Sequence, residues 1–398
     1  MGRDVPERTR GHLRIRSSVE HRPCREARGH MGGGAMTGYQ LFSILVLFQF
    51  GTTVIFGFAA GAGRDAWITA AGSALLGCVL IAGYAGITKL TGYVSLVQWF
   101  RGGFGSWIGV PLAWLYPLLF IYDAARILTD LEFLVPLTLL PATPPWFFLA
   151  AILAVALYLM FSGVEVLGRI AGVLLPILVL FSLLEAVLLI ASKSFHPEYF
   201  FPILGEGWGR VFTGIWPLGI TQTYGESIEM AVFWHLLNKK ERLPTVGIAA
   251  TLFAGLFIVL FDVLGIAAMG EHLFMEMIFP AFTILNLSSV AGFLENLNAL
   301  GAMYFLCTSF VKMAVHLIAA AMCIQELTAA ANSGAAIWLS AGSAFFVSLT
   351  MTNNFSEHLQ AGLERLPYAL WVPMFILLPA AAGAASWLGR RFKRAAYR

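Results

Sequence analysis

The sequence predicts an all-α, polytopic membrane protein. Hydrophobic residues make up 59% of the 398 positions and charged residues only 12%, a balance far from that of soluble globular proteins. Uncharged apolar runs of roughly 20 residues, long enough to cross a bilayer as helices, recur along the chain. The net charge of +3 does not indicate a nucleic-acid-binding protein, because the basic residues concentrate in the two tails and a few short loops.

Ten apolar runs can be marked off from Thr37 onward, and the sequence predicts a membrane helix in each. Their approximate bounds are 38–62, 66–89, 106–138, 145–162, 168–191, 209–236, 244–269, 293–325, 334–352 and 368–389. The third and eighth are longer than a bilayer requires, which implies tilt or extension beyond the headgroups. We therefore expect one membrane domain of about ten helices, residues 37–390, followed by a basic tail, residues 391–398.

Residues 1–36 differ from the rest of the chain. They are rich in Arg, end in a Gly stretch and contain no apolar run long enough for a signal peptide. We expect this extension to be disordered. Two interpretations stay open: a basic cytoplasmic arm on anionic lipid, or a start codon assigned too early, with Met31 or Met36 as the true start.

The basic residues near the segment ends predict the orientation. With the N-terminus cytoplasmic, the inner loops contain Lys89, Arg101, Arg169, Lys239, Lys240 and Arg242, and the C-terminal tail adds five more basic residues. The outer side keeps only Arg64, Lys193, Arg210 and Arg365. This asymmetry favours cytoplasmic placement of both termini. Two long outer connections, 192–208 and 270–290, are candidate extracytoplasmic lids.

The sixth segment contains the strongest signal for a ligand site, the stretch WPLGITQTYGESIE from Trp216 to Glu229. Pro217 removes a backbone donor, and Gly219 and Gly225 lower helix propensity. The sequence predicts a break between Pro217 and Gly225. Such a break at membrane depth is tolerated only against protein or a water-filled cavity, and in transporter folds broken helices supply backbone groups to a buried solute.

The break predicts the chemistry of its ligand. Freed amides and the start of the following half-helix favour an anionic group, whereas freed carbonyls and Glu226 favour an ammonium. A zwitterionic amino acid suits that arrangement. For Glu226 one alternative stays open, that it is a structural carboxylate paired within the bundle. Glu229 is expected to be a gate or packing residue and not a ligand.

The first segment carries a second stretch of low helix propensity, Gly51 to Thr53, followed by Gly57. Small residues of this kind also serve close helix packing, but the pairing with the sixth segment favours local unwinding. Together with a weaker candidate from the third segment, the predicted ligand-binding residues are Gly51, Thr52, Thr53, Tyr122, Thr221, Gln222, Thr223, Tyr224, Gly225 and Glu226.

Charged residues inside the membrane segments are costly and therefore informative. Asp123, Arg126 and Asp130 in the third segment fall on one helical face, and we expect a ladder of ion pairs with a structural or gating role. Lys312 shares a face of the eighth segment with His316. Three interpretations of Lys312 stay open: a fixed cation paired with Asp262 or a third-segment carboxylate, a coupling cation, or a direct solute contact.

Nothing in the sequence indicates an enzyme. HExxH, GxSxG and Walker motifs are all absent from it. The four cysteines have no CxxC spacing, so neither a disulfide framework nor a metal cluster is indicated. We expect no catalytic activity, no cofactor and no bound metal.

From about Thr37 to the C-terminus the chain resembles the endospore germination receptor B subunits, also called spore germination permeases, of the amino acid/polyamine/organocation transporter superfamily. The matching pieces are Asp65 to Ile68 after the Gly-rich first segment, the LLPATPP run, Phe201 to Trp208, Tyr224 to Glu226, and Phe293 to Glu295. Their order and spacing across ten segments make the resemblance specific.

The resemblance implies a fold of two inverted five-helix repeats, with the first and sixth helices broken at a central site. It also implies a subunit that senses a small-molecule germinant, commonly an amino acid, beside an A subunit and a lipoprotein C subunit in the spore inner membrane. The chain departs from the family at Asn296 and at 127–129, where relatives carry charged residues. Superfamily members that bind sodium use Ser or Thr of the eighth helix together with first-helix carbonyls. The resemblance implies that Lys312, close to Thr308 and Ser309, substitutes for that cation, so no sodium site is expected.

Two functional classes follow. In the first, the chain is a germinant sensor, in which a bound nutrient biases the conformation of partner subunits or opens an ion path. In the second, it is a proton-coupled amino acid permease that completes alternating access by itself. The fold does not separate them. Asp123, Arg126, Asp130, Glu229 and Lys312 are the predicted coupling or gating residues in either class.

Overall fold

The computed structural model describes residues 34–287, 297–352 and 354–396. In this part of the chain the secondary structure is helical, apart from one isolated bridge between Met36 and Leu237. Nine of the described helices are long and apolar enough to cross a membrane. The tenth predicted segment is the sixth, which is broken into short pieces. The predicted all-α membrane fold is therefore confirmed.

The first five segments form the first half of the chain. They consist of α1 (Gly38–Phe50) with α2 (Thr53–Phe56), α3 (Ala66–Thr91), α4 (Leu96–Thr138), α5 (Pro145–Ser162) and α6 (Val164–Ala191). Two short 3-10 turns, Ala60–Asp65 and Pro197–Phe200, flank the outer ends of this half.

The second half repeats the pattern with a broken helix first. It consists of α7 (Trp208–Gly214) and the pieces that follow it, α8 (Leu243–Glu276), α9 (Pro280–Leu287), α10 (Leu297–Thr328), α11 (Gly334–Met351), α12 (Phe355–Gln360) and α13 (Leu378–Ala396). Two π-helical stretches, Ala361–Arg365 and Pro367–Leu377, join α12 to α13. Because each half contains an odd number of spans, the second half enters the bilayer from the opposite side, which makes the repeats inverted.

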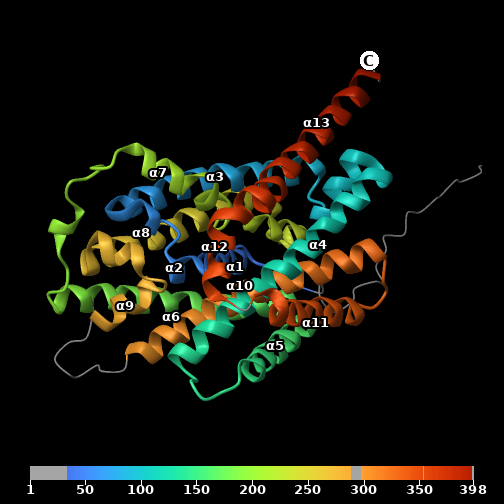
Figure 1. The fold of residues 1–398 in the computed structure, drawn as a ribbon. Coiled ribbons are helices and arrows are strands. Elements are labelled where there is room, and N and C mark those ends of the chain that lie inside the picture. The colour runs from blue at the N-terminus through green and yellow to red at the C-terminus, as the bar shows by residue number, and fades with distance from the viewer. Residues whose placement is uncertain (1–33, 288–296, 353, 397–398) are drawn as a thin grey trace, which may run out of the picture.

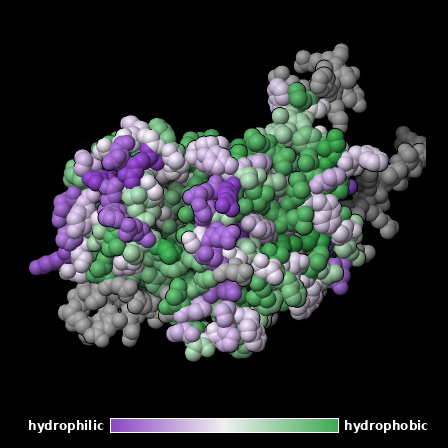
Figure 2. Space-filling model, in the orientation of Figure 1, coloured by the Kyte–Doolittle hydropathy of each residue, from purple (hydrophilic) through white to green (hydrophobic). Residues whose placement is uncertain are grey.

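The halves pack face to face. The most extensive helix contacts join α10 to α4 and α3 to α8, and α13 projects past the rest of the bundle towards the C-terminus (Figure 1). Apolar side chains cover much of the face in Figure 2, while hydrophilic ones gather mainly at its left end and beside α12. An apolar exterior of this kind suits contact with lipid.

Two helices extend beyond the predicted spans. At about 1.5 Å per residue, the 43 residues of α4 exceed any bilayer core. Gly105, with φ 73°, kinks this helix one residue before the predicted start of the third segment. In α8, Gly270 has φ 73° and the helix continues beyond the kink to Glu276, into the connection that the sequence predicted as a lid. The continuation carries Glu271 back onto the bundle.

The first helix breaks where the sequence predicts. α1 ends at Phe50, Gly51 adopts φ 29° and ψ −120°, and α2 starts at Thr53. In the sixth segment, Trp216 is non-helical within a π-helical turn, Ile215–Gly219. Residues 222–224 form a turn before a 3-10 helix, Gly225–Val232. Both breaks are confirmed, because Gly and Pro occupy the positions that cannot continue a helix without cost.

The predicted outer lids lie against the break region. Glu271 binds two arginines, Arg64 after the first helix and Arg210 in α7. Beside them, the Leu204 amide donates to Asp65 at 2.9 Å. The two connections that the sequence marked are thus tied to each other and to the first helix by charge-assisted hydrogen bonds.

At the opposite end of the bundle, the chain is ordered one residue earlier than predicted. Met36 is fully buried, its amide donates to the Leu236 carbonyl at 2.9 Å, and its own carbonyl accepts from Asn238 at 3.0 Å. The start of the first segment is therefore held to the end of the sixth. Several predicted features lie outside the described residues: the extension up to residue 33, Val290, the Phe293 to Glu295 piece and Asn296.

The α3 contacts generate a stability prediction. A Cβ placed on Gly77 would lie 2.4 Å from the Tyr224 ring, whereas one on Gly83 meets no atom within 4 Å. Gly77→Ala is therefore expected to lower the unfolding free energy by about 1–3 kcal/mol through overpacking, and Gly83→Ala to leave it unchanged or slightly raised. Thermal unfolding of both purified variants in detergent checks this. Equal melting temperatures would contradict the packing of α3 on the sixth segment.

Candidate functional site

A cavity lies where the two helix breaks face each other. Its volume is about 30 Å³. Six of its lining side chains are acidic or basic, and the rest are apolar or neutral polar. The lining residues are Thr52, Phe56, Asp123, Arg126, Ile127, Asp130, Gln222, Glu226, Lys312, His316, Leu359, Gly362, Leu363 and Trp371.

An ion pair between Glu226 and Lys312 closes one wall of the cavity. The Lys312 Nζ lies 2.5 Å from the Glu226 Oε2, and the two side chains are only 3% and 5% exposed. The ammonium also lies 5.4 Å from the centre of the Phe48 ring, within cation–π range. The partner of Lys312 is thus a sixth-segment carboxylate, and the predicted pairing with Asp262 or the third segment is wrong. The sequence missed it because the 3-10 turn at Gly225 redirects Glu226.

The break in the first helix makes room for Lys312. A Cβ on Gly51 would lie 2.3 Å from the Lys312 Cδ, and the φ of 29° is one that residues with a side chain rarely adopt. The Gly51 carbonyl, freed by the break, accepts a hydrogen bond of 3.0 Å from the Thr308 hydroxyl of α10. The backbone opening and the eighth-segment cation therefore depend on each other.

Neutral polar side chains join the two broken helices. Gln49 donates to Ser227 and to Thr251, each at 3.1 Å, and the Thr53 and Thr223 hydroxyls are hydrogen-bonded at 3.3 Å. All five side chains are buried. Buried polar groups that are satisfied in this way fix the register of the elements that carry them.

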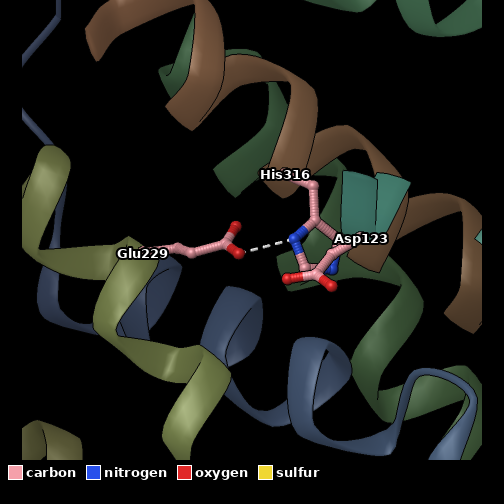
Figure 3. Close-up of side chains that lie close together, drawn as sticks. All are labelled: Asp123, Glu229 and His316. Atoms are coloured by element: carbon pink, nitrogen blue, oxygen red, sulfur yellow. Dashed lines mark hydrogen bonds and ion pairs between the residues drawn. The ribbon is translucent and has the colours of Figure 1, made fainter. Parts of the chain in front are cut away.

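The expected ladder of ion pairs on α4 does not form. Asp130 pairs with His358 of α12 at 3.0 Å, and Arg126 donates to the His358 carbonyl at 3.4 Å. Asp123 instead lies beside the Glu229 and His316 side chains (Figure 3). The face was predicted correctly, but the partners come from other segments, which the spacing within one helix does not reveal.

A second contact runs parallel to the Glu226–Lys312 pair. The His316 Nδ1 and the Glu229 Oε1 are hydrogen-bonded at 2.6 Å, with side chains 1% and 0% exposed. Glu229 follows Glu226 by one turn of the 3-10 helix, and His316 follows Lys312 by one turn of α10. The sixth and eighth segments are therefore linked by two successive acid–base contacts.

The structure brings only part of the predicted ligand set to the cavity. Thr52, Gln222 and Glu226 line it. Gly51 packs on Lys312, and Thr221 donates to the Pro217 carbonyl of its own helix at 2.9 Å. The other predicted ligand residues, Thr53, Tyr122, Thr223, Tyr224 and Gly225, are not among the lining residues. The predicted gating residues Asp123, Arg126, Asp130 and Lys312 do line the cavity, and Glu229 lies directly behind it.

Sequence reasoning missed the wall that α12 and the π-helical stretches after it supply. Leu359, Gly362, Leu363 and Trp371 lie in these elements, and only Trp371 falls within the predicted tenth segment. A Cβ on Gly362 would lie 2.3 Å from the Arg126 guanidinium. The available signal was Gly362 close to Pro367 and Pro373 in an otherwise apolar run, which departs from regular α-helix as π-helix here.

Comparisons with known proteins place this site in context. Residues 35–356 match the family model described as "Spore germination protein". The chain is 26% identical over 340 residues to Spore germination protein KB of Bacillus subtilis (strain 168), which covers 85% of this chain and 91% of the relative.

Two solved transporter structures resemble the chain in fold. Mhp1, a nucleobase-cation-symport-1 family transporter in a closed conformation with bromovinylhydantoin bound, superposes with a TM-score of 0.62 at 12% identity, covering 89% of this chain and 82% of Mhp1. MhsT in complex with L-phenylalanine superposes with a TM-score of 0.50 at 14% identity, covering 88% and 85%. At these identities the likeness shows the fold alone, a transporter-type five-plus-five repeat.

The buried ion pair generates a double-mutant prediction. Lys312→Met leaves Glu226 without its cation, and Glu226→Gln leaves Lys312 without its anion, so each single variant is expected to lose about 3–5 kcal/mol of stability. The double variant is expected to recover most of that loss. Thermal unfolding in detergent measures the cycle.

A surface pair supplies the control for that cycle. Arg169 and Glu165 are 69% and 34% exposed, so Arg169→Met is expected to cost less than about 1 kcal/mol. Strictly additive losses in the Lys312 and Glu226 variants would show that the two side chains are not coupled.

Proposed function

The chain belongs to the spore germination protein family, and on that premise we propose that it is the germinant-sensing membrane subunit of a spore germination receptor. The ligand is a small nutrient of the amino acid class, bound in the cavity between the two helix breaks. Binding signals to partner A and C subunits or opens an ion path. The subunit resides in the spore inner membrane with both termini cytoplasmic.

The class of ligand is inferred from one observation: positively and negatively charged side chains line the same buried cavity. Arg126 and Lys312 line it together with Asp123, Asp130 and Glu226. A zwitterion offers a carboxylate to the cations and an ammonium to the anions, so it satisfies both without leaving an uncompensated charge. A purely apolar ligand would leave these groups unpaired.

The cavity also suits a switch. Both ends of the bundle are tied, at Met36 by backbone hydrogen bonds and at Glu271 by two arginines. A ligand that competes for Glu226 or Lys312 alters the contact between the sixth and eighth segments, and a differential affinity for the two arrangements shifts their populations. Partner subunits that contact those segments would respond to the change in these populations.

The second candidate is a proton-coupled amino acid permease, which the buried acidic and basic side chains of the same cavity would also serve. The decisive experiment co-expresses the chain with its A and C partners in spores and measures ion release on addition of amino acids. The sensor predicts triggered release that depends on this chain. Concentrative uptake by the purified subunit alone, with normal germination in its absence, would establish the permease instead. Genes for A and C subunits beside this one would support the sensor.

Gln222 gives a matched test of the ligand site. It lines the cavity and its buried Oε1 has no hydrogen-bond partner among the described residues, so it is free to bind a ligand donor. Gln222→Leu is expected to raise the amino acid concentration for half-maximal ion release about tenfold, because the ligand loses one hydrogen bond, which contributes about 1.5 kcal/mol to binding.

Thr221→Val serves as the control. Its hydroxyl donates to Pro217 within the same helix and does not face the cavity, so the dose response is expected to stay close to that of the wild type. Immunoblots of spore membranes would show unchanged abundance of both variants. A dose response that shifts equally in the two variants would place the ligand elsewhere.

A further inference from the structure

A second cluster of ionisable side chains lies one helical turn from the Glu226–Lys312 pair. Asp123 of α4, Glu229 of the sixth segment and His316 of α10 each offer an oxygen or nitrogen atom within 4.8 Å of the others, and all three are buried (Figure 3). Asp123 and His316 also line the proposed ligand cavity, and Glu229 lies directly behind it. Its members come from three segments far apart in the chain.

The cluster is incompletely hydrogen-bonded. Glu229 Oε1 and His316 Nδ1 are paired at 2.6 Å. Both Asp123 oxygens, the Glu229 Oε2 and the His316 Nε2 are buried without a hydrogen-bond partner among the described residues. Asp123 is 97% buried, since its relative exposure is 3%, and it points into the cluster. Groups this polar are rarely left without a proton, an ion or a water between them.

The surrounding charges leave the cluster with excess negative charge. Asp123, Glu229, Glu226 and Asp130 are four carboxylates, against the two fixed cations Lys312 and Arg126. His358 of α12 pairs with Asp130, and the buried Cys323 thiol of α10 lies within electrostatic reach of Glu229. Uncompensated charge at this depth is strongly disfavoured, so a proton or a cation must bind here.

The short distance between Glu229 and His316 indicates whether a proton or a metal cation binds here. A metal such as zinc holds nitrogen and oxygen ligands at about 2.0–2.2 Å, which keeps ligand atoms in a tetrahedral site about 3.4 Å apart. The observed 2.6 Å between the His316 Nδ1 and the Glu229 Oε1 is shorter than that separation and matches a short charge-assisted hydrogen bond between these two atoms. The geometry fits a proton between the groups.

We propose that Asp123, Glu229 and His316 form a proton-binding site, in which a carboxyl group of Asp123 or Glu229 is protonated at neutral pH and exchanges its proton through the His316 imidazole. Exchange moves only a proton, from a carboxyl O–H to an imidazole nitrogen and onward. The site changes the charge one turn from Lys312, so its occupancy alters the electrostatics of the cavity wall. It does not depend on which ligand the cavity takes.

Infrared difference spectroscopy of the full-length protein in lipid nanodiscs tests the proposal without any added ligand. The spectrum of the wild type minus that of Asp123→Asn/Glu229→Gln at neutral pH is expected to contain the C=O stretch of a protonated carboxyl group, downshifted in D₂O and lost as the pH rises. His316→Gln is expected to shift the frequency of this band, because it replaces the hydrogen-bond partner of Glu229. A purely structural role for the cluster would produce neither change.

The control is Glu326→Gln, since both Glu326 oxygens accept hydrogen bonds, from Ser95 and Gln98. Its difference spectrum is expected to contain ionised carboxylate bands only. Glu185 and Asp262 are also buried, but the subtraction removes their contribution. Should the double variant not fold, the two single variants supply the same difference spectra. The proposal would be overturned if the difference spectra for Asp123 and Glu229 contained bands of ionised carboxylates and none of a protonated carboxyl group. A stoichiometric metal present in the wild type and absent from the double variant would show a metal site instead.

Discussion

The ion pair between Glu226 and Lys312 is the interaction on which the rest of the site depends. A lysine ammonium in the middle of a membrane protein is tolerable only beside a compensating anion. Its stem passes the break at Gly51, where no side chain would fit, and Thr308 bonds the carbonyl that the break frees. The first, sixth and eighth segments are thus assembled around one cation. Removing the cation would leave a buried carboxylate and an opened helix facing each other.

This arrangement explains why the helix breaks are stable without lipid-exposed backbone. Backbone carbonyls at both breaks accept hydrogen bonds from the opposite half of the chain, Gly51 from Thr308 and Gly225 from Tyr84. Side-chain hydrogen bonds at Gln49 and between Thr53 and Thr223 also join the two broken helices. Backbone at membrane depth is tolerated where protein or a cavity satisfies it. The cavity is what remains between the breaks after those contacts are made. Its walls therefore carry the charges that hold the bundle together, and a ligand that binds there competes with structural interactions.

That competition connects the proposed ligand site with the proposed proton site. Glu226–Lys312 and Glu229–His316 are successive contacts between the same two elements. A ligand at the first contact and a proton at the second act on one interface, so each changes the electrostatic environment of the other. For a sensor, such coupling transmits a small change in the cavity to segments that reach both ends of the bundle. For a permease, the same coupling would link solute to protons.

The sequence by itself determined the fold class, the ten segments and the positions of both helix breaks, because hydropathy, Gly and Pro act locally on the backbone. It also placed Asp123, Glu226, Glu229 and Lys312 among the functional candidates, since ionisable residues in apolar runs are costly. Only the tertiary structure decided their partners. Lys312 pairs with Glu226 and not with Asp262, Asp130 pairs with His358, and the π-helical stretches after α12 close the cavity at Gly362 and Trp371. These contacts join residues far apart in the chain, and their choice depends on how whole helices pack, which no local pattern encodes.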